Sequence, residues 1–507
     1  MARLHEYQGK ELLEKVGIPV PKGRPAKSPD EVREVARELG GKVMLKIQAW
    51  ITGRAGIGGI KVADSPEEAY EVSRELFGME VGNFKVDTLL VEEKLDIEKE
   101  YFASLIVDDV EGKPLILFSS VGGTGIEEIA KKHPEKVVKI YVDLLNPIKE
   151  FEIRNKLRSV GISGRELLQV GGILHKLFLL ARKYDTRSAE INPLVKTKLG
   201  KFFAADCRIA VDDYAVYRHP ELGIEIAREL DRPPTELDRI AYRVEEGDYR
   251  GTFYFIQLEQ NFKKGEGYIG FHGAGGGGSM MSMDAIFNRG YKIANFCDTS
   301  GNPPASKVYR AARIILSQKN IDGYFGSGSG VASQEQFHSA RGLVKAFREA
   351  PLRVPAVIRL GGNSEDKAVQ ILTEYTKDLP VSVEGYKKND TPDYCAERLD
   401  YLIKNFKPPK EVKKFAPPKP KKPYRFKTLT GEVVLDHDKC AKCETKVCVQ
   451  ECVPGILKIE NGLPVLAISE EEAKKGKCIE CLACEIECWA RGNKGGYVYL
   501  PIEGLEG

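Results

Sequence analysis

The sequence predicts an α/β protein of several domains that ends in a small cysteine-rich α+β module. At 507 residues the chain exceeds what one hydrophobic core usually supports, so three or four domains are expected. Residues 250–405 repeat a strand, a glycine-rich turn and a helix, which predicts a doubly wound parallel sheet. Eight of the eleven cysteines fall between Cys440 and Cys488, a clustering typical of metal binding rather than of disulfides.

The composition is that of an ordinary globular protein, with 42% apolar and 30% charged residues. A net charge of +3 is small for this length and argues against a nucleic-acid or membrane partner held by bulk electrostatics. No apolar run approaches the ~20 residues that a membrane-spanning helix needs. The N-terminal stretch is charged and amphipathic and lacks the apolar core of a secretion signal, so we expect a cytoplasmic protein.

The predicted order of domains follows changes in composition along the chain. Residues 1–235 alternate β-branched apolar runs with helical stretches, and residues 250–405 form the doubly wound domain. Residues 406–427 carry six prolines and many lysines without an apolar period, so we expect an extended, semi-rigid tether. Residues 428–507 hold the cysteine cluster and, at Asn461-Gly462, the signal for a β-hairpin turn.

The cysteines form two sets whose spacing is typical of iron–sulfur proteins. The first set has the spacing C-x2-C-x4-C-x3-C and the second C-x2-C-x2-C-x3-C. The segment resembles two-cluster ferredoxins, in which the fourth cysteine of each run binds the other cluster. The first [4Fe–4S] cluster is therefore assigned to Cys440, Cys443, Cys448 and Cys488, and the second to Cys478, Cys481, Cys484 and Cys452. Paired C-x2-C motifs also suit zinc, which is the alternative.

The N-terminal half carries two features that suit a nucleotide and a metal ion. Lys46 ends a predicted strand and precedes a glycine-rich segment, an arrangement that suits a triphosphate, although a surface hairpin would have the same pattern. A hairpin centred on Leu199 would place Asn192 directly opposite Asp206 on one face. An amide oxygen and a carboxylate so placed can share Mg²⁺; a solvated polar pair is the alternative.

These features stand in segments that resemble the β subunit of succinyl-CoA synthetase. The segments LHEYQGKELLEKVGIPVPKG, VEEKLDIEKEYFASLIVDD and EINPLV follow the order and spacing of that family. The resemblance implies an ATP-grasp domain over residues 1–235 and a flavodoxin-like ligase domain over residues 250–405. It also implies ATP and Mg²⁺ as ligands, without deciding between ATP and GTP.

The resemblance further implies roles for individual residues. The phosphate contacts would be Lys46, Gly53, Arg54 and Ala55; the adenine and ribose cleft would be lined by Glu92, Leu95 and Glu100; Mg²⁺ would be held by Asn192 and Asp206. Glu190 would face a phosphohistidine that a partner subunit brings in. No histidine of this chain stands in the family's phosphohistidine context and no CoA-binding half is evident, so the resemblance implies a separate α-type subunit carrying both.

Two glycine-rich loops in the second half suit anionic ligands. Residues 273–278 fit the dinucleotide fingerprint, which alone leaves NAD binding open. Their alignment with the ligase family's own loop implies an acyl substrate and phosphate instead. Residues 326–333 lead into a predicted helix whose free amides would bind an anion, and an ordinary loop ahead of a helix is the alternative. By resemblance, the substrate carboxylate or the histidine-bound phosphate would lie at Gly330, Val331 and Ala332.

The walls of this expected pocket depart from the succinate pattern of the family. His272 replaces an asparagine, Val331 a glycine and Gly361 a glutamate, so we expect an acid other than succinate. His272 is either a catalytic residue or a hydrogen-bonded core histidine.

The sequence thus predicts a subunit of an ADP-forming acid–CoA ligase, with a cysteine module that exchanges electrons with a redox enzyme partner. The alternative is an iron–sulfur electron-transfer subunit of an oxidoreductase complex, in which a ligase-derived body serves as a scaffold. Lys46, Asn192 and Asp206 are all present, which favours the ligase.

Overall fold

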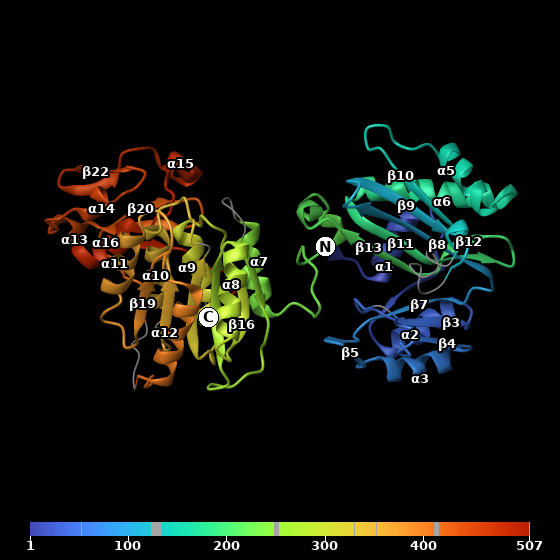
Figure 1. Ribbon diagram of the computed structural model, residues 1–507, viewed down its shortest axis with the longest axis horizontal. Coiled ribbons are helices and arrows are strands. Elements are labelled where there is room, and N and C mark those ends of the chain that lie inside the picture. The colour runs from blue at the N-terminus through green and yellow to red at the C-terminus, as the bar shows by residue number, and fades with distance from the viewer. Residues whose placement is uncertain are drawn as a thin grey trace. The chain divides into compact units, whose positions relative to one another are not determined.

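The computed structural model describes residues 1–51, 53–122, 133–247, 253–328, 330–350, 352–409 and 415–505. These residues belong to two compact units, 1–234 and 235–507, each considered by itself (Figure 1). Among the described residues, no helix combines the length and the apolar character that crossing a membrane requires.

The described part of the first unit contains two larger antiparallel sheets with helices packed against them, and the two-stranded β5–β6 hairpin. The smaller sheet has the strand order β2-β7-β3-β4, and the larger has the order β1-β13-β11-β8-β9-β10 with β12 paired to β11. The strands are β1 (Ala2–Arg3), β2 (Gly23–Ala26), β3 (Val43–Ile47), β4 (Ile60–Ala63), β5 (Glu80–Val81), β6 (Phe84–Lys85), β7 (Leu89–Glu93), β8 (Ile97–Asp108), β9 (Lys113–Ser119), β10 (Val137–Tyr141), β11 (Thr186–Thr197), β12 (Phe202–Ala204) and β13 (Cys207–Val211). The helices are α1 (Glu6–Lys15), α2 (Pro29–Glu38), α3 (Pro66–Leu76), α5 (Glu150–Leu157) and α6 (Gly164–Lys183).

Local sequence signals explain where the helices of the smaller sheet begin. Both α2 and α3 start with proline directly after a serine, and each serine hydroxyl accepts a hydrogen bond from a backbone amide of the first turn. Serine at the cap satisfies an otherwise free amide, and proline at the first helical position costs no hydrogen bond. The apolar face of α2, formed by Val32, Val35 and Ala36, is buried in the core of this lobe.

The second unit is built on the doubly wound sheet that the sequence predicts. Its strands lie in the order β14-β16-β15-β17-β18-β19, and all neighbours from β16 to β19 are parallel. Counted along the chain from β15, the parallel strands have the order 2-1-3-4-5, which is the flavodoxin-like order. The strands are β14 (Tyr254–Gln257), β15 (Tyr268–Ala274), β16 (Lys292–Asp298), β17 (Gly323–Gly328), β18 (Ala356–Arg359) and β19 (Val383–Tyr386). The helices are α7 (Glu236–Glu246), α8 (Gly276–Phe287), α9 (Ala305–Leu316), α10 (Phe337–Glu349), α11 (Glu365–Glu374) and α12 (Pro392–Lys404).

The cysteine segment forms a small α+β structure at the end of the same unit. Strands β20 (Pro423–Lys427), β21 (Glu432–Asp436) and β24 (Gly496–Tyr499) form one antiparallel sheet. Strands β22 (Leu457–Glu460) and β23 (Leu463–Leu466) form the expected hairpin, with Asn461 and Gly462 at φ +51° and +76° in its turn. The helices are α13 (His437–Ala441), α14 (Val447–Gln450), α15 (Glu470–Glu472), a π-helical turn (Ala473–Lys477) and α16 (Ala483–Arg491).

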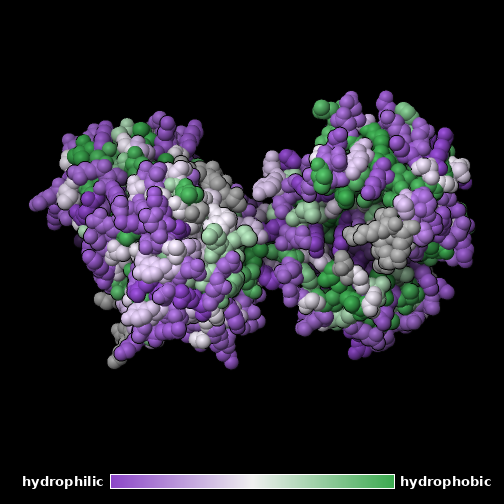
Figure 2. Space-filling view, viewed as in Figure 1, coloured by the Kyte–Doolittle hydropathy of each residue, from purple (hydrophilic) through white to green (hydrophobic). Residues whose placement is uncertain are grey.

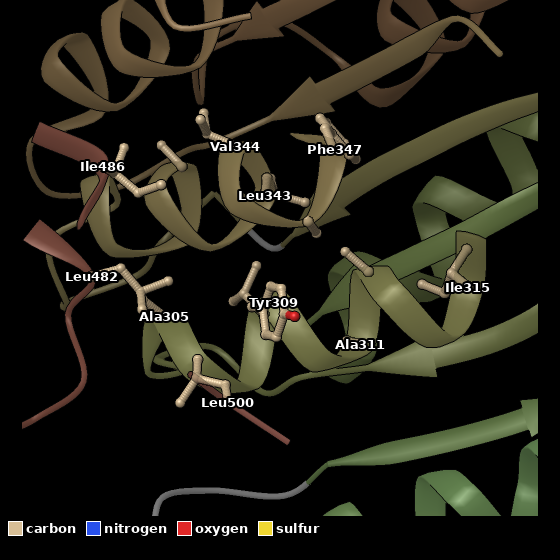
Figure 3. Packing of buried hydrophobic residues seen from close by; sticks show 14 of the residues in the cluster. Ala305, Tyr309, Ala311, Ile315, Leu343, Val344, Phe347, Leu482, Ile486 and Leu500 are labelled. Carbon is tan, nitrogen blue, oxygen red and sulfur yellow. The ribbon is translucent and has the colours of Figure 1, made fainter. Parts of the chain in front are cut away.

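The cysteine segment shares one hydrophobic core with the doubly wound sheet. Leu482, Ile486 and Leu500 belong to the same buried cluster as side chains of α9 and α10. Figure 3 shows Leu482 and Leu500 beside Ala305 and Tyr309 of α9. The extended, semi-rigid tether expected ahead of the cysteine segment therefore does not hold that segment apart, because apolar faces from both parts are buried against each other.

Buried ion pairs join the same two parts. Arg341 of α10 is fully buried and lies 2.7 Å from Glu487 of α16, which is 1% exposed. Lys345, one turn further along α10, is also fully buried and lies 2.8 Å from Glu485. Tyr375 donates a further hydrogen bond to Glu487 at 2.7 Å. Removing one partner of such a buried ion pair leaves the other charge buried and unpaired, which is strongly destabilising.

The proline-rich segment itself is shorter than predicted. Residues 406–409 and 415–422 contain no helix or strand, as expected for a linker, and residues 410–414 lie outside the described part. The expected tether ran to residue 427, but Pro423–Lys427 is strand β20, which pairs with β21. Alternate burial explains the difference, because Phe426 is buried in the common core while Arg425 and Lys427 are exposed.

Candidate functional site

The predicted nucleotide lysine lies in a buried cluster of charges in the first unit. Lys46 is the penultimate residue of strand β3 and has 4% of its side chain exposed; its Nζ donates to Glu6 Oε1 at 3.0 Å and to the Ala205 carbonyl at 2.6 Å. It also pairs with Glu92 of β7. Burial alone would lower the pKa of Lys46, but Glu6, Glu92 and Asp206 outweigh it and raise the pKa. Lys46 is thus a firmly charged cation held by carboxylates.

Two members of this cluster, Glu6 and Lys10, were not among the predicted residues. They stand one turn apart on α1, and Lys10 lies 2.8 Å from Glu6 and 2.5 Å from Glu92. Both are at most 5% exposed. The sequence signal was a Glu and a Lys at i, i+4 on a face that the helix buries, in the segment HEYQGK.

The hairpin between β11 and β13 has the predicted register. Ile191 pairs with Cys207 and Leu194 with Ala204, and the Asn192 amide donates to the Asp206 carbonyl at 3.1 Å. Asn192 and Asp206 are therefore opposite each other, as the sequence predicts. The Asn192 side-chain amide donates to Glu190 at 3.3 Å, so Glu190, the residue expected to face the partner histidine, lies beside the Asn192–Asp206 pair.

Asp206 faces the glycine-rich loop after β3. Arg54 Nη2 donates to both of its carboxylate oxygens at 2.8 Å and also lies 2.7 Å from Glu6. Burial and the Glu6 charge raise the pKa of Asp206, opposed by Arg54 and Lys46. Gly53 has φ +70° and an exposed, open surface, and Ala55 is exposed beside it. The loop thus offers one guanidinium and an accessible backbone next to the hairpin.

The residues expected to line an adenine and ribose cleft lie on β7, on the turn after it and on β8. Glu92 belongs to the charge cluster and pairs with Lys46 and Lys10, on the phosphate side. Leu95 is half-buried in the turn after β7, and Glu100 is exposed on β8 opposite Val195.

The second unit carries a pocket at the place where its strand order reverses. In doubly wound sheets, ligands bind at the carboxyl ends of the strands flanking this switch point. Here the flanking strands are β15 and β17, and the pocket is lined by His272, Ala274, Ser327, Gly330, Arg359 and Gly361, among others. The fold therefore brings the predicted acyl residues of two separate glycine-rich loops to one site.

His272 is held as a neutral side chain in this pocket. Its Nδ1 lies 2.5 Å from the Tyr324 hydroxyl and its Nε2 lies 3.2 Å from the Thr299 hydroxyl. Burial lowers its pKa to about 4. Both nitrogens already have partners, which is the arrangement of a hydrogen-bonded core histidine rather than of a proton donor.

The glycine-rich loop of residues 326–333 differs from the predicted helix entry. Helix α10 begins only at Phe337, so the amides of Gly330, Val331 and Ala332 are not at its N-terminus. Ala332 instead forms an isolated bridge with Gly362. Val331 is 79% exposed and points away from the core.

Arg359, at the end of β18, is the pocket residue that the sequence reasoning missed. Its guanidinium donates to the carbonyls of Gly328 at 2.7 Å, Lys388 at 2.7 Å and Asp390 at 2.6 Å. Within the described residues it makes no ion pair, so it leaves a positive charge at the pocket wall beside Gly330. A carboxylate or phosphate is the ligand that such a charge favours.

The loop of residues 273–278, which fits the dinucleotide fingerprint, is hydrogen-bonded to Asp298 at the end of β16. Asp298 accepts hydrogen bonds from the backbone amides of Gly275 and Ser300, both at 2.8 Å. In a dinucleotide site the residue in this position binds the ribose. In this chain the Asp298 carboxylate instead holds the backbone of the glycine-rich loop and of Ser300 through these two hydrogen bonds.

The eight cysteines of the C-terminal segment lie in two groups. Burial and then the nearby thiols of Cys488, Cys448 and Cys443 raise the pKa of Cys440 to about 12. Gly495 lies against the sulfurs of both Cys440 and Cys488, which places these two cysteines from opposite ends of the segment close together. The other group lines one cavity, with Cys452, Cys478, Cys481 and Cys484 in its walls. Within the described residues, no group of three or more His, Cys, Asp or Glu side chains is placed to hold a single metal ion.

Comparison with known proteins agrees with the geometry of both units. Residues 3–196 match the ATP-grasp domain family, and residues 260–394 match a family described as ATP citrate lyase citrate-binding. The chain is 38% identical to the succinate–CoA ligase [ADP-forming] subunit beta 1 of Archaeoglobus fulgidus over 378 residues, which are 74% of this chain and 94% of the relative. The chain belongs to the succinate–CoA ligase β-subunit family.

Other members and structures extend this assignment. The succinate–CoA ligase [GDP-forming] subunit beta of Thermus thermophilus is 35% identical over 386 residues, 76% of this chain and 97% of the relative. The solved structure of ATP citrate lyase from Methanothrix soehngenii in complex with citrate and coenzyme A shares the fold, with TM-score 0.65, 20% identity, and coverage of 80% of this chain and 100% of that one. The succinate–CoA ligase β-subunit family consists of ATP-dependent acid–thiol ligase subunits, and this chain is one of them.

Proposed function

We propose that the chain is the nucleotide-binding subunit of an ADP-forming acid–CoA ligase, catalysing acid + ATP + CoA ⇌ acyl-CoA + ADP + phosphate with a second subunit. The observation that carries the proposal is the charge cluster around Lys46 and Arg54 beside the Asn192–Asp206 pair, inside a domain of the ATP-grasp family. Three cations and three carboxylates balance there before any nucleotide binds.

The residues of the cluster fit Mg²⁺ and a triphosphate. Asn192 and Asp206 offer one amide and one carboxylate oxygen, and phosphate and water supply the remaining ligands of an octahedral ion. Bound there, Mg²⁺ would neutralise charge on the phosphates. Arg54 and Lys46 would bind the phosphate oxygens, which requires Arg54 to exchange Asp206 for phosphate.

Glu190 stands beside Asn192 and would face the incoming partner histidine. The phosphoryl group moves from ATP to that histidine, and the partner then carries it to the acyl pocket of the second unit. There Arg359 and the loop at Gly330 would hold the acid while its carboxylate takes the phosphoryl group. CoA, bound by the partner, displaces phosphate. His272 shapes the pocket wall and takes no proton, because its pKa lies near 4.

The acid is a small carboxylic acid. The names of the curated relatives give succinate, whereas the family that matches residues 260–394 is described as citrate-binding. His272 and Gly361 distinguish this pocket from the succinate pattern, so we propose an acid other than succinate.

Reconstitution tests this proposal. The chain alone should form no acyl-CoA, and adding a phosphorylatable α-type subunit should produce ADP, phosphate and acyl-CoA in equal amounts with one acid of a panel that includes succinate and citrate. The measurement is ADP and CoA-thioester release. Acyl-CoA formation by the isolated chain contradicts the division of labour, and no turnover with any partner or acid favours the scaffold alternative.

We further propose that residues 423–505 bind two [4Fe–4S] clusters and exchange electrons with a redox enzyme. The placement of the cysteines supports this, since Gly495 lies against the sulfurs of both Cys440 and Cys488, and Cys452, Cys478, Cys481 and Cys484 line one cavity. A cubane binds one cysteine at each of four irons, so it does not need the side-chain constellation of a single ion. When bound, the clusters would supply one-electron transfer at low potential.

Amide groups around the cysteines fit this assignment. The amides of Gly495 and Gly496 point to Cys488 Sγ at 3.3 and 3.4 Å. Hydrogen bonds to cysteine sulfur stabilise the thiolate form and adjust the potential of iron–sulfur centres.

Metal analysis distinguishes clusters from zinc. Protein purified without oxygen should be brown and contain about eight irons per chain, because each cubane holds four. Cys452→Ser should disturb the cluster whose other ligands begin at Cys478, seen as loss of about half the iron with one set of electron paramagnetic resonance signals retained. Stoichiometric zinc without visible absorbance contradicts the cluster proposal.

A further inference from the structure

We propose that the edge of the cysteine segment around the first cysteine set is the docking surface for an acidic electron-transfer protein. The inference rests on the proposed clusters and adds the place and the charge of the contact. Four lysines form this edge, which we call the basic rim: Lys439, Lys442, Lys446 and Lys494.

Each rim lysine is next to a ligand of the first proposed cluster. Lys439 precedes Cys440, Lys442 precedes Cys443, and Lys446 lies between Cys443 and Cys448. Lys494 comes from the other end of the segment, directly before the amides that point to Cys488. The rim therefore surrounds one cluster position from two separate stretches of chain.

Hydrogen bonds hold these two stretches together. Lys439 Nζ donates to the Lys494 carbonyl at 3.2 Å, and Thr445 Oγ1 donates to the Arg491 carbonyl at 3.0 Å. Lys446 Nζ donates to the Cys440 carbonyl at 2.5 Å. Each contact uses a neutral acceptor, so the ammonium charges stay uncompensated. Among the described residues, none of the four rim lysines makes a salt bridge.

The carboxylates of the neighbourhood are engaged elsewhere. Glu451 pairs with Lys367 at 2.9 Å and with Arg491 at 2.7 Å, and Asp438 lies 3.7 Å from Lys422. Glu444 is the exposed carboxylate within the rim. The rim thus keeps a net positive charge. At the end of the unit that bears α13, Figure 2 shows a hydrophilic surface interrupted by hydrophobic patches.

The second cysteine set has lysines on one side only, in the stretch before it: Lys474, Lys475 and Lys477 are exposed, and Lys475 pairs with Glu471 at 3.3 Å. Between Cys478 and Cys484 the charged residue is Glu480, which is 2% exposed and accepts hydrogen bonds from Thr428 and Thr430. After Cys452 follow Val453 and Pro454, which carry no charge. We place the entry and exit of electrons at the first set because its lysines come from two separate stretches of chain, residues 439–446 and Lys494.

A groove leads from the rim toward the doubly wound sheet. It has a volume of about 540 Å³ and is lined by Lys367, Tyr375, Trp489, Arg491 and Lys494, among others. Trp489 follows Cys488 directly and is covered by the Arg348 guanidinium at 3.3 Å from its ring centre. An electron carrier seated on the rim would lie close to this aromatic ring and to the first cluster position.

Complementary charge favours an acidic partner. Lysines at the rim of a contact accelerate encounter with an anionic surface and lose this effect as salt screens them. A redox step there is a one-electron exchange, in which a reduced cluster loses one electron and the carrier gains it. The probe is a strongly acidic flavodoxin, whose flavin accepts the electron.

The test compares two double variants of equal net charge in the full chain. Lys439→Glu with Lys442→Glu reverses the rim, while Lys263→Glu with Lys319→Glu reverses two exposed lysines of the doubly wound domain, outside the cysteine segment. At low salt, the rim variant should reduce flavodoxin at a rate at least about tenfold lower than the unaltered chain, and calorimetry should show correspondingly weaker binding. The control variant should match the unaltered chain in both measurements. Lys442→Glu alone gives a second, milder rim variant.

The outcomes separate this inference from the cluster proposal. Iron content is measured first, and a chain without iron overturns both. With iron present, equal rates and affinities for the rim variants and the unaltered chain overturn the docking surface alone. A rim that binds a DNA duplex as tightly as flavodoxin, with unchanged electron transfer in the variants, also overturns it.

Discussion

Asp206→Asn should remove the dependence of nucleotide binding on Mg²⁺. The carboxylate is the charged metal ligand of the proposed site, and its loss should weaken binding of Mg·ATP by about 100-fold, or ~2.7 kcal/mol. Binding of ATP in the presence of a chelator should stay the same or improve, because Arg54 then loses one of its two carboxylate partners and is freer to bind phosphate. Calorimetry with and without Mg²⁺ measures both effects.

The variant should still fold. Arg54 keeps Glu6 at 2.7 Å, and Asn192 and residue 206 stay linked through the backbone hydrogen bond of the hairpin. Asp109→Asn, in the β8–β9 turn, is the matched control, since Asp109 lies on the same unit and its side chain is 82% exposed. Unchanged binding of Mg·ATP to Asp206→Asn would show that the Asn192–Asp206 pair does not hold the metal.

The register of this hairpin could be predicted because it is a local property. The turn at residues 198–200, with Gly200 at φ +74°, fixes which residues of the two strands oppose each other. The same holds for the Asn461-Gly462 turn, and the doubly wound sheet follows from its repeated strand, turn and helix pattern. Each of these features is determined by residues close together in the sequence.

The residues that sequence reasoning missed depend on distant partners. Glu6 and Lys10 become site residues only because α1 packs beside β3 and β7, tens of residues away. Arg359 acquires its role from the carbonyls of two separate loops. A charged residue in a helix or at a strand end carries no local sign of such a partner.

The error over the tether has the same origin. Proline and lysine content predicts an extended linker, but it says nothing about what the following segment packs against. The signals for packing lay in Arg341 and Lys345, on the buried face of α10, and in Glu485 and Glu487 between the last cysteines. Their opposite charges suggest a pairing only once the two helices are known to meet.

Glu487→Ala should destabilise the second unit by about 3–5 kcal/mol, because it leaves the Arg341 guanidinium buried without its closest carboxylate. Water cannot replace the lost carboxylate, because the Arg341 side chain is fully buried. Its remaining carboxylate partner, Glu451, lies 3.2 Å away. Tyr375 loses a hydrogen-bond acceptor as well. Denaturant unfolding and hydrogen exchange of α10 and α16 measure the effect.

A double variant separates the charge from the packing. Replacing a buried ion pair by apolar side chains of similar volume is often neutral, so Arg341→Met combined with Glu487→Met should recover much of the loss caused by Glu487→Ala. Glu444→Gln, an exposed carboxylate of the same segment, should change stability by no more than about 0.5 kcal/mol. Iron content must be equal in all variants for the comparison to report on the ion pair.

Truncation after Lys404 extends the same argument to the whole segment. A free tether predicts that the shortened chain keeps its ligase activity, whereas the shared core predicts the reverse. Removal would uncover Arg341, Lys345 and the apolar faces of α9 and α10. Each Å² of apolar surface newly exposed to water costs about 25 cal/mol of folding free energy. The second unit should then unfold at lower denaturant or aggregate, and acyl-CoA formation should fall with it. A truncated chain that unfolds like the full chain and keeps its activity would show that the cysteine segment is not part of the ligase fold.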